Sequence, residues 1–154
     1  EQASATAQRL AQLSQMALVS SPMKRCQETA GFLSGLWNDA AVTVEPLVTE
    51  IPSPDGYELG ERIDWLRAAM AGTWAALGSP YTDFRDDVVR YVAQSAVDTV
   101  IFSHFIAINA VIGSCLGDDR LVIDSLDNAS VTVFETHGGL RLIERGNQAD
   151  TLIR

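Results

Sequence analysis

The first part of the chain combines helix-like and strand-like patterns of apolar residues. Apolar residues recur at helical spacing over residues 2–16, and Ala17–Ser20 then form a short apolar run typical of a buried strand. Pro22 suits the first turn of a helix, so we expect the next helix to start at Ser21 or Pro22. The order helix, strand, helix is the beginning of an α/β pattern.

The middle of the chain predicts one more strand, a loop and two helices. Residues 42–48 contain alternating apolar residues typical of a short strand, and two prolines with two glycines predict a loop over residues 51–60. Apolar residues at helical spacing from Ile63 predict a helix that ends near Gly78. Ser79-Pro80 then resembles a capped start of the following helix.

The last third predicts a strand, a helix and a hairpin. Thr99–Phe102 is a run of β-branched and aromatic residues, which indicates a strand buried on both faces. A helix over Ile106–Leu116 is capped by Gly117. Strands over residues 130–136 and 140–145 flank a Gly-Gly turn. We therefore expect an α/β three-layer sandwich, with helices on both faces of a mostly parallel mixed sheet and a C-terminal antiparallel hairpin.

Composition narrows the class of protein. The 154 residues are 47% hydrophobic, which suits a single domain over residues 1–154. Eleven Lys and Arg oppose 20 Asp and Glu, giving a net charge of -9 without a basic patch, so we expect neither a nucleic-acid nor a membrane partner. Cys26 and Cys115 are far apart and lack nearby histidines, which argues against a disulfide framework or a metal site. With no signal-like start, a cytoplasmic protein with reduced thiols is expected.

Two strand-to-helix corners carry candidate chemistry. In open α/β sheets, ligands bind at the carboxyl ends of the strands, where helix N-termini favour anions. The first corner places Arg25 after the strand at residues 17–20, and the second places His104 after Thr99–Phe102. A guanidinium and an imidazole facing one pocket would suit a phosphoryl group. Glu50, at the end of another apolar segment, is a candidate general acid.

Each candidate also has an ordinary structural interpretation. Arg25 could be a solvated residue or a salt-bridge partner, and His104 could be a structural histidine after a strand. Glu50 could be solvated, and His137 lies in a Gly-Gly context typical of a surface turn. Spacing alone does not decide between these readings.

Taken together, the segments resemble the histidine phosphatase superfamily, the phosphoglycerate-mutase-like fold, over essentially the whole chain. ALVSSPMKRCQETA matches the family's Ser-x-Met-x-Arg-x-x-x-Thr-Ala stretch, LVTEIPSP matches its acid-bearing segment, and TVIFSH matches its second-histidine segment. DNASVTVFE and LRLIERGNQADTL resemble its closing hairpin and tail. The four motifs occur in the family's order.

The resemblance implies a phosphomonoester hydrolase or a phosphoryl mutase. It implies that Arg25 and His104, as guanidinium and imidazolium, hold the phosphate, and that His104 and Glu50 are catalytic, Glu50 as general acid and base. It further implies a phosphohistidine intermediate with neither metal nor cofactor, and a small phosphorylated metabolite or phosphoester as substrate. The substrate's identity and the oligomeric state stay open, a homodimer included.

The sequence departs from the family in two places. The family opens with a strand ending in Arg-His-Gly, whose histidine is the nucleophile. Residues 1–154 contain no such segment, and His104 and His137 cannot replace that histidine. Because that strand lies inside the family's sheet, we expect residues before Glu1 or another chain segment to supply it, so that strands 17–20 and 99–103 are paired on both sides. Phe105-Ile106 stand where many members have small residues, which predicts a narrower, more apolar pocket.

Two other functions remain open. Ser21-Pro22-Met23-Lys24 fits the Ser-x-x-Lys motif of penicillin-binding acyl transferases, with Ser21 as nucleophile and Lys24 as base, although the companion motifs are absent. The stronger alternative is a noncatalytic phosphate-ligand-binding or protein-interaction module on the same fold. Binding of a phosphorylated ligand without turnover would distinguish it from an enzyme.

Overall fold

A computed structural model of the protein describes residues 2–146, so the end of the tail motif, residues 147–152, lies outside the described residues. The helices are α1 (Gln2–Leu10), α2 (Lys24–Leu36), α3 (Leu59–Met70), α4 (Trp74–Leu77), α5 (Tyr81–Ala93) and α6 (Phe105–Leu116), with a 3-10 helix η1 at Pro46–Val48. The strands are β1 (Ala17–Ser20), β2 (Val42–Val44), β3 (Thr99–Phe102), β4 (Val133–Glu135) and β5 (Arg141–Glu144). Among these helices, none combines the length and apolar character needed to cross a membrane.

The sheet is parallel and has the order β2-β1-β3. Leu18 of β1 pairs with Val42 on one side and with Val100 on the other. β4 and β5 form a separate antiparallel hairpin. The predicted α/β class with a C-terminal hairpin is confirmed.

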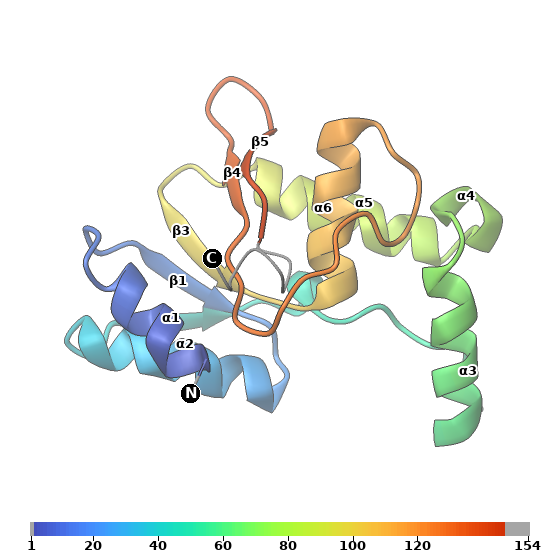
Figure 1. Ribbon diagram of the computed structural model, residues 1–154, viewed down its shortest axis with the longest axis horizontal. Coiled ribbons are helices and arrows are strands. Elements are labelled where there is room, and N and C mark those ends of the chain that lie inside the picture. Colours follow the sequence, from blue (N-terminus) through green and yellow to red (C-terminus); the bar gives the residue numbers. More distant parts are fainter. Residues whose placement is uncertain (1, 147–154) are drawn as a thin grey trace.

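The helices lie on both sides of this sheet (Figure 1). α1 and α2 cover one face, where Leu18, Leu33 and Trp37 form a buried cluster. α5 and α6 lie on the other side and pack together around Val88 and Val111. This arrangement directs the carboxyl ends of β1 and β3 toward the N-termini of α2 and α6.

The predicted helix ending near Gly78 is in fact two helices, α3 and α4, separated at Gly72 and Thr73. The Gly72 carbonyl accepts a hydrogen bond from the Leu121 N–H (3.1 Å), and the Thr73 hydroxyl caps α4 by accepting from the Ala76 N–H. Because these partners replace helical hydrogen bonds, the helix stops and restarts there.

Two other boundaries differ for local reasons. β2 ends at Val44 because Pro46 begins η1, which the Glu45 carboxylate caps by accepting from the Leu47 N–H. α2 begins at Lys24, later than the expected Ser21 or Pro22. The expected loop over residues 51–60 ends early, since a capping box at Glu58 starts α3 at Leu59.

The expectation that β3 is buried on both faces is wrong. All four of its residues are only half-buried, because β1 is its single strand partner among residues 2–146. β1 is paired on both sides, as expected. β3 was also expected to be paired on both sides, but its second edge is open within the described part of the chain.

α6 is held in place by one buried side chain. Asn109 is fully buried, its amide nitrogen donates to the carbonyls of Phe105 and Asp124, and its oxygen accepts from the N–H groups of Ile123 and Asp124. The segment that follows α6 is thereby fixed against the helix. Gly117 ends α6 in a left-handed conformation, as predicted.

Candidate active site

The two predicted corners lie side by side because β1 and β3 are parallel neighbours. Ser20 is opposite Phe102 in their register, and the Ser21 N–H donates to the Phe102 carbonyl over 2.9 Å. The residues that follow each strand therefore meet at one edge of the sheet.

His104 occupies the centre of this edge. It is buried and forms the N-cap position of α6. Its Nδ1 lies 3.1 Å from Arg25 Nη2, and its Nε2 lies 2.8 Å from Ser21 Oγ. The Cys26 Sγ is a further neighbour, 3.5 Å from Nε2. All these partners come from the segment that begins directly after β1.

The contacts determine where the imidazole proton resides. A guanidinium can only donate, so Nδ1 must accept from Arg25 and carry no proton. The neutral ring then carries its proton on Nε2, which donates to the Ser21 hydroxyl. Burial, and secondarily the charge of Arg25, lower the pKa of His104 from 6.5 to about 4. In this state the imidazole is neutral at pH 7, unlike the imidazolium that the resemblance implies.

Arg25 lies in the first turn of α2 and is exposed. Among residues 2–146 it has no ion pair with a carboxylate, so the salt-bridge interpretation does not hold there. The contact with His104 brings the N-termini of α2 and α6 together, and neither has a side-chain cap. Uncapped N–H groups, the helix dipoles and the guanidinium all favour an anion at this place.

Glu50 follows η1 and is partly buried. Burial raises the pKa of its carboxyl, while the Ile51 N–H bond and the charge of Arg25 act in the opposite direction. The Ser103 hydroxyl donates to the Val48 carbonyl over 2.7 Å and ties this segment to the end of β3. The structure thus brings Arg25 and His104 into direct contact, and the charge of Arg25 also acts on the Glu50 carboxyl.

Other residues considered from the sequence lie elsewhere. His137 is exposed in the β4–β5 turn, as expected. The Lys24 side chain is 89% exposed and pairs with Glu28, so it does not serve Ser21 as a base. The expectation that Phe105-Ile106 narrow the pocket is corrected, because Ile106 is 1% exposed in a core cluster against which Phe105 also packs.

Sequence reasoning missed Ser21 and Cys26 as partners of His104. Ser21 is 83 residues from His104 and Cys26 is 78, so no local pattern links them. The only signal in the sequence comes from considering both strands together. Because β1 and β3 are parallel neighbours, the residues that follow β1 meet the residues that follow β3.

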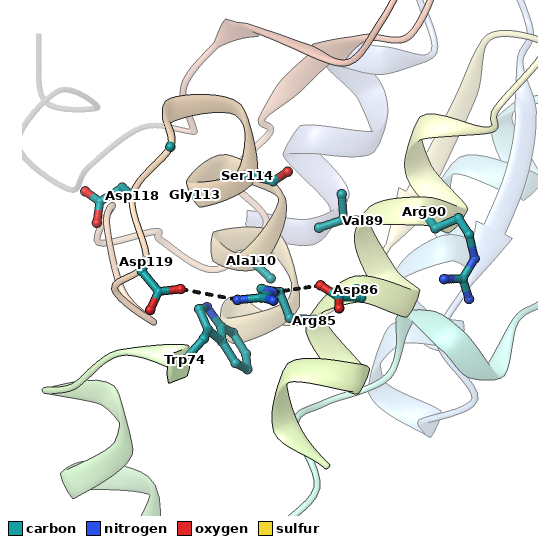
Figure 2. A pocket seen from close by; sticks show the side chains of 11 residues that line it. Trp74, Arg85, Asp86, Val89, Arg90, Ala110, Gly113, Ser114, Asp118 and Asp119 are labelled. Atoms are coloured by element: carbon teal, nitrogen blue, oxygen red, sulfur yellow. Dashed lines mark hydrogen bonds and ion pairs between the residues drawn. The ribbon is translucent and has the colours of Figure 1, made fainter. Parts of the chain in front are cut away.

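A cavity of about 440 Å³ lies away from this site, between α5 and the C-terminal end of α6 (Figure 2). One of the charged residues that line it, Arg85, already pairs with Asp86 at 2.9 Å and with Asp119 at 3.2 Å. Within residues 2–146, no group of three His, Cys, Asp or Glu side chains could hold a metal ion.

Comparisons with known proteins agree with the fold. The family model of the histidine phosphatase superfamily (branch 1) matches residues 1–149. A mycobacterial glucosyl-3-phosphoglycerate phosphatase has a similar structure, with 21% identity, a TM-score of 0.71, and coverage of 96% of this chain and 85% of that one. YhfR from Bacillus stearothermophilus has 19% identity and a TM-score of 0.74, covering 96% and 82%.

A third similar structure is the phosphoserine phosphatase of Entamoeba histolytica in complex with 3-phosphoglyceric acid. It has 19% identity and a TM-score of 0.72, covering 96% of this chain and 81% of that one. No curated protein sequence matches the chain. Since the family model extends over nearly all residues, the chain belongs to the histidine phosphatase superfamily (branch 1).

Proposed function

We propose that the protein is a phosphomonoester hydrolase, or a phosphoryl mutase, that works through a phosphohistidine. The observation that carries the proposal is the contact between Arg25 and His104 where two uncapped helix N-termini meet, with Glu50 close by. Membership of the superfamily supports it. The site residues are Arg25 and His104 for phosphate binding, and His104 and Glu50 for catalysis.

In this proposal, the nucleophile comes from outside these 154 residues. Of the two histidines, His104 is bound to Arg25 and Ser21, and His137 is exposed in the hairpin turn. We propose that a strand ending in Arg-His-Gly supplies it and completes a single domain with residues 1–154.

The open edge of β3 is the place for this strand. β3 is half-buried and has no second strand partner among residues 2–146. The Thr136 hydroxyl donates to the Ser95 carbonyl over 2.9 Å, which holds the hairpin near the start of β3. A strand added parallel to β3 would end beside His104, so a histidine following it would face Arg25.

The reaction then has two balanced steps. In the first, the nucleophilic histidine forms a bond to phosphorus while the bond to the leaving oxygen breaks, and Glu50 donates its proton to that oxygen. In the second, water attacks phosphorus, Glu50 takes the water's proton, and phosphate leaves the histidine. Arg25 and His104 hold the non-bridging oxygens and stabilise their charge in both steps. A mutase would differ only in replacing water with an acceptor hydroxyl.

The raised pKa of Glu50 favours this role, because a general acid must hold its proton near neutral pH. A small phosphorylated metabolite is the substrate class that we propose. Two of the similar structures are named as phosphatases of glucosyl-3-phosphoglycerate and of phosphoserine, and both names describe small phosphoesters.

The test is hydrolysis of para-nitrophenyl phosphate by a protein that carries an Arg-His-Gly strand ahead of Glu1. We expect turnover that survives a chelator and an acid-trapped phosphohistidine, and background turnover from residues 1–154 alone. Arg25→Ala and His104→Ala should each cost about 2 to 4 kcal/mol of transition-state stabilisation. Full activity in both variants would remove these residues from the site.

The alternative is a noncatalytic binding module. It rests on the same observation, that neither His104 nor His137 is placed to act as the nucleophile. If the strand-bearing protein binds inorganic phosphate but forms no phosphohistidine, the site is a binding module, and the hydrolase proposal is wrong.

A further inference from the structure

We propose that Ser21 is a positioning residue whose hydroxyl, together with the Arg25 contact at Nδ1, keeps the proton of His104 on Nε2 and thereby presents Nδ1 to the phosphate. The inference rests on the proposed function only in assigning His104 to phosphate. It concerns a residue that would touch the imidazole and not the substrate.

The Ser21 hydroxyl is held rigidly. Ser21 is fully buried, and its own N–H is bound to the Phe102 carbonyl. Its Oγ also accepts from the Met23 N–H over 3.2 Å, as the chain turns into α2. One lone pair of the oxygen is therefore used by the backbone, and the remaining one faces Nε2 at 2.8 Å.

Ser21 is the stronger of the two acceptors available to Nε2. The other is the Cys26 sulfur, which lies farther away, at 3.5 Å, and thiols accept hydrogen bonds weakly. The Cys26 thiol is also a donor to the Ser103 carbonyl. Burial raises the pKa of Cys26, so the sulfur stays a neutral thiol and not a stronger thiolate acceptor.

The opposite edge of the ring is the one that faces the anion site. Nδ1 lies against Arg25, the exposed cation in the first turn of α2. If Nε2 keeps its proton, Nδ1 can release Arg25 to a phosphate and take up a proton from water or from the phosphate, whose negative charge favours the imidazolium, and so become a second donor. If the proton moved to Nδ1 in the free protein, two donors would oppose each other across 3.1 Å, and the Arg25 contact would break.

The test is the ¹⁵N NMR spectrum of the imidazole nitrogens, which distinguishes protonated from unprotonated ring nitrogens. With two histidines in the sequence, His137→Gln assigns the spectrum. In the wild type we expect Nε2 protonated and Nδ1 unprotonated at pH 7. In Ser21→Ala, Arg25 still opposes a proton on Nδ1, so we expect Nε2 to stay the main site while part of the proton population moves to Nδ1. In Ser21→Thr we expect the wild-type pattern.

Ser20→Ala is the matched control. Ser20 is equally buried, but its hydroxyl donates to the Ser21 carbonyl and does not touch His104. It should give the wild-type pattern. If Ser21→Ala does not fold, Ser21→Cys keeps the size of the side chain with a weaker acceptor and should shift the proton in the same direction.

A wild-type ring protonated on Nδ1, or an unchanged ring in folded Ser21→Ala or Ser21→Cys, would overturn the inference. Equal changes in Ser20→Ala would overturn it too, since the effect would then be one of packing. Adding inorganic phosphate separates this result from the proposed function. An Nε2-protonated ring that phosphate does not perturb would leave Ser21 as the positioning residue and refute the phosphate site.

Discussion

Acidification from pH 7 to pH 5 should destabilise the folded protein by about 2 kcal/mol through His104 alone. The pKa of this imidazole falls from 6.5 to about 4 on folding, mainly because it is buried and next because it faces Arg25. Between these two values the unfolded chain binds a proton that the folded protein does not, so stability falls as the pH falls. Each pH unit between the two pKa values changes the free energy of unfolding by about 1.4 kcal/mol. Most of the loss on going to pH 5 comes from the 1.5 pH units between 6.5 and 5.

The assay is urea unfolding at a series of pH values, with His104→Gln as the variant and His137→Gln as the control. Glu50 acts in the opposite direction, since a raised pKa makes its protonation favour the folded state, but it is present in every variant. His104→Gln should therefore lose about 2 kcal/mol less than the wild type between pH 7 and pH 5. The exposed His137 is replaced in the control, which should keep the wild-type slope. Equal slopes in His104→Gln and the wild type would refute the reasoning.

Two further predictions concern the packing of α6. Asn109→Ala removes four hydrogen bonds of a fully buried side chain and should destabilise the protein by about 3 kcal/mol or more in urea unfolding, and a loss under 1 kcal/mol would contradict the role given to Asn109. Gly113→Ala would place a Cβ 2.6 Å from the Asp118 carbonyl oxygen and should cost about 1 to 3 kcal/mol in thermal unfolding. Gly31→Ala, in α2 with open space around it, should instead stabilise by about 0.5 to 1 kcal/mol, and the same sign in both variants would contradict the packing argument.

The elements that the sequence predicted well are those with local signals. β1 and β3 are apolar runs whose bounds match the structure, and Gly117 marks the end of α6 because it adopts a left-handed conformation there. The break between α3 and α4 has a weaker local signal, Gly72 followed by Thr73, which caps α4. It also depends on a hydrogen bond from Leu121 to Gly72, two residues that are distant in sequence.

The candidate site also has a part that the sequence predicted and a part that it did not. Arg25 and His104 could be predicted as neighbours, because residues after adjacent parallel strands meet at one edge of the sheet. The protonation state of His104 could not, since it depends on burial and on contacts with Arg25 and Ser21. The half-buried β3 also could not be foreseen from its apolar sequence, because burial depends on which strands lie beside it.

The most direct test of the phosphate site is calorimetric binding of inorganic phosphate to three proteins, the wild type, Arg25→Ala and Lys24→Ala. Both variants lose one positive charge from the first turn of α2, but only Arg25 contacts His104, while Lys24 is 89% exposed beside Glu28. A hydrogen bond to a charged group contributes about 1.5 to 3 kcal/mol, so Arg25→Ala should weaken binding by roughly 10- to 100-fold and Lys24→Ala by less than about threefold. Equal weakening in both variants, or unchanged binding in Arg25→Ala, would contradict the assignment of Arg25 and His104 to phosphate.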